Sequence, residues 1–339
     1  MIRLAIAGLQ HPHIETIIEE ATLRDEVELV AVSEPDQDVR RHAADRFGTP
    51  VFATHTEMLD ATEIDVIGVG AAYADRAQII IDTLSAGIDV IADKPLCTTL
   101  EDLDRIEAAW ATSGRTLSMA LEKRFYPPTL AADRILASGE LGRLALVTAS
   151  APHKLTRQRR PAWFLEAATY GGILNDLAVH DVDLLLHFSG GRRGTVHGHT
   201  GNYGNPDRPG FEDYGVAVLT VHDGPVATLE SHWMSPESAP YHGDYRMRLT
   251  GTDGTAELLW KDDVLTVATH SRPPWNEPLP PRIRPAQDFF DALLAGRSPV
   301  ISAADTFAAT RVALLAQESA RRDAILDWDV THAPEEAPR

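Results

Sequence analysis

Three side chains of this sequence have the types and the spacing of a proton-transfer site. Lys94 lies in "DVIADKPL", after an apolar run and before a proline, and Asp176 and His180 lie four residues apart in "NDLAVHD". Residues four apart share one face of a helix. A fixed ammonium at Lys94 could hydrogen-bond a substrate hydroxyl, while a neutral imidazole at His180 could take the hydroxyl proton. Asp176 could orient either the hydroxyl or the imidazole.

Each of these groups also has an ordinary structural interpretation. A lysine at the end of a strand is often a solvated cation, and Asp176 and His180 have further carboxylates beside them, as in an ion cluster on a helix. A metal site on His11 and His13, or on His180 with nearby carboxylates, is a third interpretation. No HExxH-like pair or cysteine-rich spacing accompanies these residues, so we predict no metal centre.

The first apolar run ends in a loop that could hold a dinucleotide. "RLAIAG" is followed by "LQHPHIETIIEE", so a glycine ends a strand and a helix follows. Of the pattern G-x-G-x-x-G only the first glycine is present. Either Gln10 and His11 supply side-chain donors where backbone N–H groups usually bind pyrophosphate, or the dinucleotide lies slightly farther from the strand. The predicted cofactor contacts of this loop are Gly8, Leu9, Gln10, His11, Pro12 and His13.

An acidic residue follows the second apolar run. "LVAVSEPD" places Glu34 at the expected end of a strand, where a carboxylate can accept hydrogen bonds from the adenosine ribose hydroxyls. The same charge repels a 2′-phosphate, and no arginine directly follows it. This favours NAD over NADP, although a solvated glutamate before a turn is the ordinary alternative.

The segment ahead of "NDLAVHD" is rich in basic and aromatic side chains. It reads "PHKLTRQRRPAWFLEAATYGG". An aromatic ring there could stack on the apolar face of a sugar, and an arginine or lysine could bind a carboxylate or phosphate. Most of these side chains are expected on the surface or in the core, and Trp163 is the one that we select as a substrate contact.

The pattern of apolar runs predicts the elements that position these residues. Residues 1–121 alternate short apolar runs with amphipathic stretches, which indicates βαβ units and a doubly wound parallel sheet. After Pro127 and Pro128 come short runs such as "RLALVTAS" and "YGVAVLTV" with Gly and Asp turns, typical of an antiparallel sheet. We predict the fold class α/β, with an α/β domain at 1–121, an α+β domain at 122–330 and a loose tail at 331–339.

Composition argues against several classes of partner. Lys and Arg number 31 against 50 Asp and Glu, a formal net charge of −19, which disfavours binding to nucleic acid or to anionic membranes. No apolar run reaches the length of a membrane span, and the N-terminus lacks a secretory pattern. The single cysteine, Cys97, excludes an internal disulfide framework. We therefore expect a cytoplasmic protein without a membrane span.

Motifs spread over nearly the whole chain match one enzyme family. "AGIDVIADKPL" is similar to a segment ending in E-K-P, "NDLAVHDVD" to a D-x-x-x-H signature, and "KRFYPPTLAADRILASGELGR" to a link between domains. Together they resemble the Gfo/Idh/MocA family, which includes glucose–fructose oxidoreductase and inositol dehydrogenase. The resemblance implies a Rossmann domain followed by an α+β domain with a large, mostly antiparallel open sheet, which often mediates homodimers or homotetramers. It also implies NAD(P)-dependent hydride transfer at a secondary alcohol or ketone of a sugar, inositol or related polyol.

The resemblance also implies roles for individual residues. It places the family's catalytic lysine, aspartate and histidine on Lys94, Asp176 and His180. Beyond the loop and Glu34, the predicted contacts are Ala71, Arg76, Asp93 and Lys94 for the cofactor, and Lys94, Arg124, Trp163, Asp176 and His180 for the substrate.

Three features depart from the family pattern. The loop lacks two glycines, Asp93 replaces a commoner glutamate, and Arg76 stands where a histidine is frequent. Two other functions therefore stay open. One is an enzyme that retains NAD and performs oxidation, elimination and reduction on a sugar, as NAD-dependent glycosidases that resemble this family do. The other is a sensor or regulator that binds dinucleotide without turnover.

Overall fold

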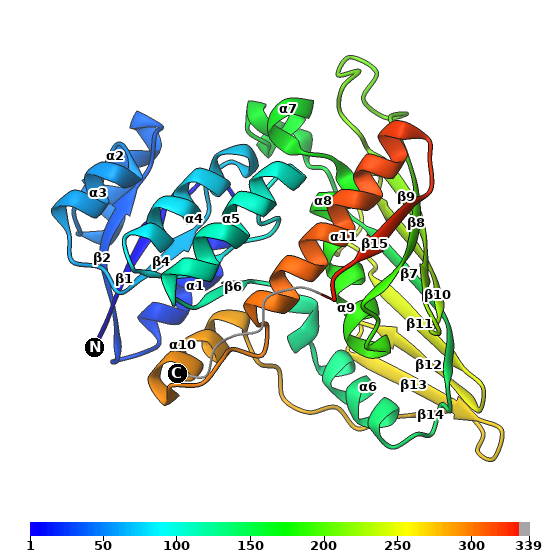
Figure 1. Ribbon diagram of the computed structural model, residues 1–339. Coiled ribbons are helices and arrows are strands. Elements are labelled where there is room, and N and C mark those ends of the chain that lie inside the picture. The colour runs from blue at the N-terminus through cyan, green and yellow to red at the C-terminus, as the bar shows by residue number, and fades with distance from the viewer. Residues whose placement is uncertain (332–339) are drawn as a thin grey trace.

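A computed structural model of the chain describes residues 1–331, which form two sheets connected by helices (Figure 1). The first sheet has six parallel strands in the order β3-β2-β1-β4-β5-β6. The order reverses between β1 and β4, and ligands of such sheets bind at the carboxyl ends of the strands beside that point. The predicted parallel sheet is confirmed. Its strands are β1 Ile2–Ala7, β2 Val27–Ser33, β3 Val51–Phe52, β4 Val66–Val69, β5 Asp89–Ala92 and β6 Leu117–Met119.

Helices cover both faces of this sheet. Capping residues define the ends of these helices. Asp36 accepts hydrogen bonds from two backbone N–H groups at the start of α2, and Gly48 ends that helix in a left-handed conformation. Thr99 starts α5 in the same way. The helices are α1 Ile14–Thr22, α2 Gln37–Phe47, α3 His55–Ala61, α4 Arg76–Ser85 and α5 Leu100–Ser113.

The second sheet has nine strands in the order β14-β13-β12-β11-β7-β10-β9-β8-β15. Only β7 and β10 pair in parallel, so the predicted mostly antiparallel sheet is confirmed. The strands are β7 Leu144–Pro152, β8 Arg193–Gly201, β9 Tyr214–Val221, β10 Val226–His232, β11 Arg246–Gly251, β12 Gly254–Leu259, β13 Val264–Thr269, β14 Trp275–Asn276 and β15 Leu326–Asp329.

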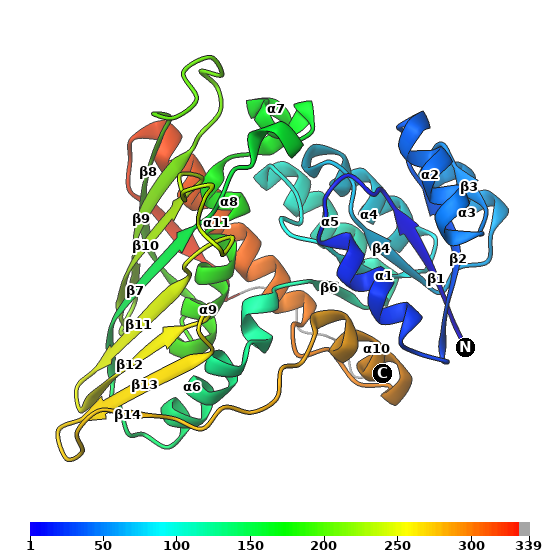
Figure 2. The same cartoon turned by 180° about the vertical axis from the view of Figure 1, so that it is seen from behind.

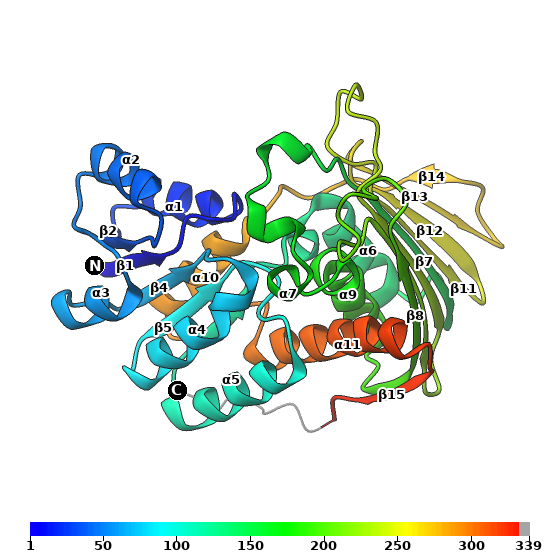
Figure 3. The same cartoon turned by 90° about the horizontal axis from the view of Figure 1, so that it is seen from above.

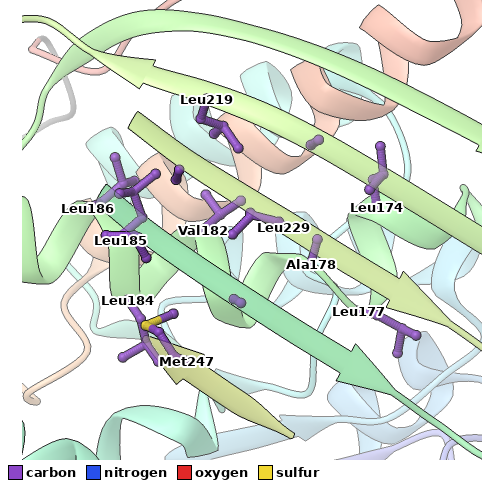
Figure 4. Packing of buried hydrophobic residues seen from close by; sticks show 14 of the residues in the cluster. Leu174, Leu177, Ala178, Val182, Leu184, Leu185, Leu186, Leu219, Leu229 and Met247 are labelled. Carbon is purple, nitrogen blue, oxygen red and sulfur yellow. The ribbon is translucent and has the colours of Figure 1, made fainter. Parts of the chain in front are cut away.

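Helices lie on the face of this sheet that looks toward the first domain, and the figures show no helix on the opposite face (Figures 2 and 3). Leu219, Leu229 and Met247 of the sheet pack against Val182 and Leu185 of α9 in one buried cluster (Figure 4). The helices of this half are α6 Pro127–Ala137, α7 Ala167–Tyr170, α8 Ile173–Asp176, α9 Val179–Ser189, α10 Pro285–Ala295 and α11 Ala303–Arg322.

Three strands of the second sheet, β8, β14 and β15, were absent from the sequence prediction. β8 reads "RGTVHGHTG", and its glycines hide the strand pattern. They are needed because α11 lies directly on β8: a Cβ at Gly198 would stand 2.2 Å from the carbonyl oxygen of Ala316. β15 follows α11 and adds an edge strand beside β8.

The last two helices connect the two halves. Phe289 and Phe290 of α10 pack with Leu4 and Ile6 of β1, and Phe307 of α11 contacts Trp110 of α5. The predicted division at residue 121 falls between the two sheets. Helices α10 and α11 follow residue 121 in the sequence but pack against the first half, so the division stays a prediction. The predicted tail lies outside the described residues except for Thr331, which hydrogen-bonds Asp329. No helix of residues 1–331 is long and apolar enough to span a membrane.

Buried ion pairs hold α9 in place. Lys123 Nζ lies 2.6 Å from Asp181 Oδ1, and the guanidinium of Arg124 donates to both carboxylate oxygens of Asp183 at 2.8 and 2.7 Å. Arg124 also lies 3.4 Å from Asp305 of α11. All of these charges except that of Asp305 are at most 5% exposed. They connect the segment that leaves the first sheet to the helix that carries His180.

We expect Arg124→Leu to lower the free energy of unfolding by about 3–5 kcal/mol, because it leaves Asp183 buried without its partner. The double variant Arg124→Leu/Asp183→Leu should recover most of that loss. Urea denaturation followed by circular dichroism measures both. Arg41→Ala, which breaks an exposed pair with Asp38, is the control and should cost less than about 1 kcal/mol. A loss below 1 kcal/mol for Arg124→Leu would contradict this account.

Candidate active site

A cavity of about 680 Å³ lies between the two halves of the molecule. One wall is formed by the loop that follows β1, together with Lys94, which follows β5. The other wall comes from residues 122–126, 153–164 and 233–245 and from His180. The cavity therefore lies at the carboxyl ends of the parallel strands, where ligands of this type of sheet bind.

Lys94 and Asp176 form a buried ion pair across this junction. Lys94 Nζ donates to Asp176 Oδ1 at 2.7 Å and to the Asp176 carbonyl oxygen at 3.2 Å. The Tyr73 hydroxyl donates to the same Oδ1 at 3.0 Å. The other carboxylate oxygen, Oδ2, has no hydrogen-bond partner among the described residues. Lys94 therefore lines the cavity, while Asp176 is fully buried behind it and holds the ammonium in place.

The structure places Asp176 and His180 differently from the single helix that was predicted. Asp176 ends α8, His180 lies in the first turn of α9, and a turn at 177–178 separates them. Gly171 and Gly172 precede α8 with φ angles of 80° and 102°. They start a short helix directed at Lys94, so Asp176 pairs with the lysine, and the structure records no contact between Asp176 and His180.

Burial and nearby cations set the protonation of this group. Burial, and then the charges of Lys94 and Lys123, hold the pKa of His180 well below its usual value, so the imidazole stays neutral. Its Nδ1 has no partner among the described residues. Burial alone would raise the pKa of Asp176, but Lys94 outweighs burial and lowers it. Burial, and then Asp176, raise the pKa of Tyr73, which stays a hydrogen-bond donor.

Residues that depart from the family pattern meet at one carboxylate. Asp93 Oδ2 accepts a hydrogen bond from Arg76 at 3.0 Å and forms a second, short one with His11 Nδ1. His13 Nδ1 lies 3.4 Å from Asp93 Oδ1. Ligand-type atoms of His11, His13 and Asp93 lie within 4.8 Å of one another, as in a metal site. Arg76 already balances the charge of Asp93, so we interpret the group as a hydrogen-bond network.

Arg76 and Asp93 support the site from beneath. Arg76 is fully buried, and it donates to the carbonyl oxygens of Ala71, Asp93 and Pro95 at 2.9, 2.7 and 2.8 Å. These bonds hold the turn that carries Lys94. The structure therefore contradicts the prediction that Arg76 and Asp93 contact a cofactor directly, because both side chains are enclosed by protein.

The loop after β1 keeps the glycine that its geometry requires. Gly8 has a φ angle of 85°, and a Cβ there would stand 2.4 Å from the Cα of Ala71. The N–H of Leu9 donates to Glu34 at 2.7 Å, and those of Gln10 and His11 both donate to the Gly70 carbonyl at 3.1 Å. These three amides have partners inside the protein, so they are not free to bind pyrophosphate.

Two side chains replace those amides as possible anion donors. Gln10 Oε1 accepts a bond from Ala72 N at 2.6 Å, which leaves the amide group Nε2 available, and His13 is partly exposed at the cavity. His11 turns toward Asp93 and is only 4% exposed. The expectation that side-chain donors replace backbone donors is therefore retained for Gln10, and His13 takes the place predicted for His11.

Glu34 hydrogen-bonds the backbone of the loop after β1 and does not line either cavity. Its two carboxylate oxygens accept bonds from Leu9 N at 2.7 Å and Asp36 N at 3.0 Å, and the residue is fully buried. This contradicts the predicted contact with ribose hydroxyls, because both oxygens already bond backbone amides.

A second cavity of about 400 Å³ lies beside this loop and shares Gln10 with the larger one. Most of its lining was missed by sequence reasoning, although the lining follows the ends of β2, β3 and β4, where a parallel sheet collects ligand contacts. Gln10 lines both cavities, so the two are adjacent at this loop. The lining is Gly8, Gln10, Ser33, Pro35, Ala53, Thr54, His55, Thr56, Ala71, Ala74, Asp75, Gln78 and Ile79.

Of the five predicted substrate contacts, Lys94, Trp163 and His180 line the larger cavity, and Asp176 and Arg124 do not. Trp163 lines the larger cavity, with its ring 4.9 Å from that of Tyr73. Arg124 does not line it, because its guanidinium is buried against Asp183, so that prediction is wrong. Sequence reasoning left unassigned several residues of the lining, among them Lys123, Tyr126, His153, Arg160, His242 and Tyr245.

The fold and this site define an oxidoreductase with a nucleotide-binding domain and a second domain that closes the active site. Residues 2–121 match the family model described as "Oxidoreductase family, NAD-binding Rossmann fold", and residues 129–257 match the "GFO/IDH/MocA C-terminal domain". The chain belongs to the Gfo/Idh/MocA family.

Named relatives agree with this assignment. The chain is 27% identical over 248 residues to inositol 2-dehydrogenase 2 of Saccharopolyspora erythraea, covering 73% of this chain and 69% of the relative. It is 23% identical to the scyllo-inositol 2-dehydrogenase (NAD(+)) of Bacillus subtilis, covering 98% of each. The structure of myo-inositol 2-dehydrogenase from Lactobacillus plantarum superposes with a TM-score of 0.80 at 21% identity, covering 97% of this chain and 99% of that one.

We expect the protein to lose stability as the pH falls below about 6.5, the ordinary pKa of histidine. Burial lowers the pKa of His11 to about 4, although the negative charge of Asp93 acts to raise it. Burial also holds the pKa values of His153 and His180 well below the usual value. In this range the unfolded chain takes up protons that the folded chain does not, so the free energy of unfolding falls with pH. Urea midpoints at pH 8, 6.5 and 5 measure the effect.

His11→Asn should make this profile shallower, because it removes one of the titrating groups. His42→Asn is the matched control, since His42 is exposed on α2, and it should leave the slope unchanged. Equal urea midpoints at pH 8 and 5 would show that the buried histidines titrate as free ones.

Proposed function

We propose that this chain is an NAD-dependent dehydrogenase or reductase that interconverts a secondary alcohol and a ketone on a sugar, inositol or related polyol. The observation that carries the proposal is the buried Lys94–Asp176 pair with a neutral His180 in one cavity. The named activities of the inositol dehydrogenase relatives support the substrate class.

When bound, nicotinamide supplies the hydride acceptor or donor. The smaller cavity would hold the adenosine end, Gln10 and His13 the pyrophosphate, and the larger cavity the nicotinamide and the substrate. The ammonium of Lys94, held by Asp176, donates a hydrogen bond to the substrate oxygen and stabilises the negative charge that develops there. The neutral imidazole of His180 accepts the hydroxyl proton, and in the reverse direction it returns that proton.

The charge of the smaller cavity supports NAD over NADP. Its lining contains Asp75 and no lysine or arginine among the described residues. A 2′-phosphate there would meet the carboxylate of Asp75, and the nearby Arg40 is held by the carbonyl oxygens of Glu34 and Pro35. This replaces the argument from Glu34, which is buried.

We expect His180→Ala to lower kcat by about 10²- to 10⁴-fold while NADH binding stays within about threefold, because the residue serves proton transfer. The assay follows absorbance of reduced nicotinamide with sugars and inositols, with NAD and NADP in parallel. His187→Ala, on the same helix but paired with Asp133 outside the cavity, is the control. Product formation without any change in bulk NAD would favour the retained-cofactor alternative, and NADH binding without turnover would favour a sensor.

We also propose that the second sheet mediates a homodimer or homotetramer of a cytoplasmic protein. The face without helices carries Leu146, Val216, Val218 and Val226 on the neighbouring strands β7, β9 and β10. Their exposed fractions are 39–52%. A contiguous apolar patch of this kind on a sheet is typical of an interface between proteins.

Val218→Glu should lower the oligomer mass measured by light scattering, because a charge would be buried in the interface. Leu294→Glu, an equally exposed apolar residue on α10, is the matched control and should leave the mass unchanged. A monomeric mass for the wild-type protein at micromolar concentration would contradict the proposal.

A further inference from the structure

The larger cavity contains a cation that forms no ion pair with a described residue, although its charge, after that of Lys94, acts on the buried carboxylate of Asp176. Arg160 is partly buried in its wall, and its Nε donates to the Leu155 carbonyl at 2.9 Å. The guanidinium carbon lies 4.4 Å from the Phe164 ring centre and 4.8 Å from that of Trp233. Arg160 forms no ion pair with a described residue. Two aromatic faces and one carbonyl thus hold a guanidinium at the cavity with donors left over.

The other cations of the lining are mostly neutralised. Lys94 pairs with Asp176, and Lys123 pairs with Asp181. The lining contains two acids. Glu15 pairs with Arg46 outside the cavity, so Glu122 is the lining carboxylate without an ion pair among the described residues. Arg159 also lines the cavity but is exposed to solvent. Arg160 is therefore the partly buried cation of this wall that lacks a partner.

Aromatic and imidazole side chains lie near Arg160 in this wall. His153 Nδ1 bonds the Ala151 carbonyl at 2.9 Å, and its ring lies 5.2 Å from that of Trp233 and 5.4 Å from that of His242. Burial, and then the charge of Arg160, lower the pKa of His242. Trp163, beside Phe164, has a buried Nε1 without a partner among the described residues. Aromatic rings and imidazoles with lowered pKa values therefore surround this one cation.

The charge of this wall opposes that of the whole chain. The chain has a formal net charge of −19, so acidic residues outnumber basic ones. An arginine without an ion pair is therefore unusual in this protein. A half-buried guanidinium without a counter-ion loses hydration, and an anionic ligand that accepts its planar pair of donors restores that loss. A carboxylate has the size and the geometry of such a ligand.

We propose that the substrate is a polyhydroxy acid whose carboxylate binds Arg160 while its secondary hydroxyl lies at Lys94 and His180. This inference rests on the proposed function and specifies its substrate class. Arg160 lies on the second-domain wall, and Lys94 lies on the first-domain wall. The carboxylate would thereby set which carbon of the chain reaches His180, and an uncharged polyol would lack that anchor.

The test uses the full-length protein saturated with NADH, and it measures binding of probe pairs by titration calorimetry. The acids are D-gluconate, D-galactonate and D-galacturonate, and the neutral partners are D-glucitol, galactitol and D-galactose. At least one acid should bind 10- to 100-fold more tightly than its partner, and Arg160→Gln should abolish the difference, as expected for one charged hydrogen-bonding group of roughly this strength. Arg160→Lys should retain part of it, because the charge stays but the planar fork is lost.

Arg157→Gln is the matched control. Arg157 lies in the same segment and carries the same charge, but it pairs with Asp207 outside the cavity and should keep the preference for acids. NADH affinity of Arg160→Gln should stay within about threefold of that of the wild-type protein. A loss of NADH affinity above tenfold would assign Arg160 to the cofactor phosphates and would overturn the proposal.

Other results would also overturn it. These are neutral sugars that bind as tightly as every acid, a preference for acids that survives in Arg160→Gln, or tighter binding of D-glucose 6-phosphate than of any carboxylate. Turnover assays separate this inference from the proposed function. Acid binding at Arg160 without oxidation of any probe would remove the dehydrogenase proposal alone, while oxidation of neutral polyols without acid selectivity would remove this inference alone.

Discussion

The ion pair between Lys94 and Asp176 joins the two halves of the molecule at the point where chemistry would occur. The lysine comes from the end of a parallel strand, and the aspartate comes from a short helix of the other half. A buried ammonium and a buried carboxylate are each costly alone, so each requires the other. Docking of the halves and formation of the site are therefore one event, in which burial, and then the charges of Lys94 and Lys123, lower the pKa of His180.

Much of the architecture could be predicted, because it depends on local periodicity. Alternating apolar runs and amphipathic stretches indicated the parallel sheet, and Lys94, Asp176 and His180 were found from their types and spacing. What could not be predicted is which groups pair. Spacing places Asp176 and His180 on one helix, but the break between α8 and α9 depends on packing, and it directs the carboxylate to Lys94. Arg124 failed as a substrate contact for the same reason, since its partner lies 59 residues away.

The departures from the family pattern also have a physical logic that appears only in three dimensions. Loss of a glycine at His13, the shorter acid at Asp93 and the exchange to Arg76 meet in one network, which also includes His11. A lone imidazole, carboxylate or guanidinium at any of these buried positions would lack a partner. Together they satisfy one another and support the turn that carries Lys94.

Helix α11 packs against α5 in the first half and lies on β8 in the second, where Gly198 permits the close approach. A twenty-residue helix shared in this way is a rigid strut between the two cores. Hinge closure, which many two-domain enzymes use to enclose their ligands, would require α11 to slide on one of its two packed surfaces. We therefore interpret α11 as the element that limits the movement of the two halves relative to each other.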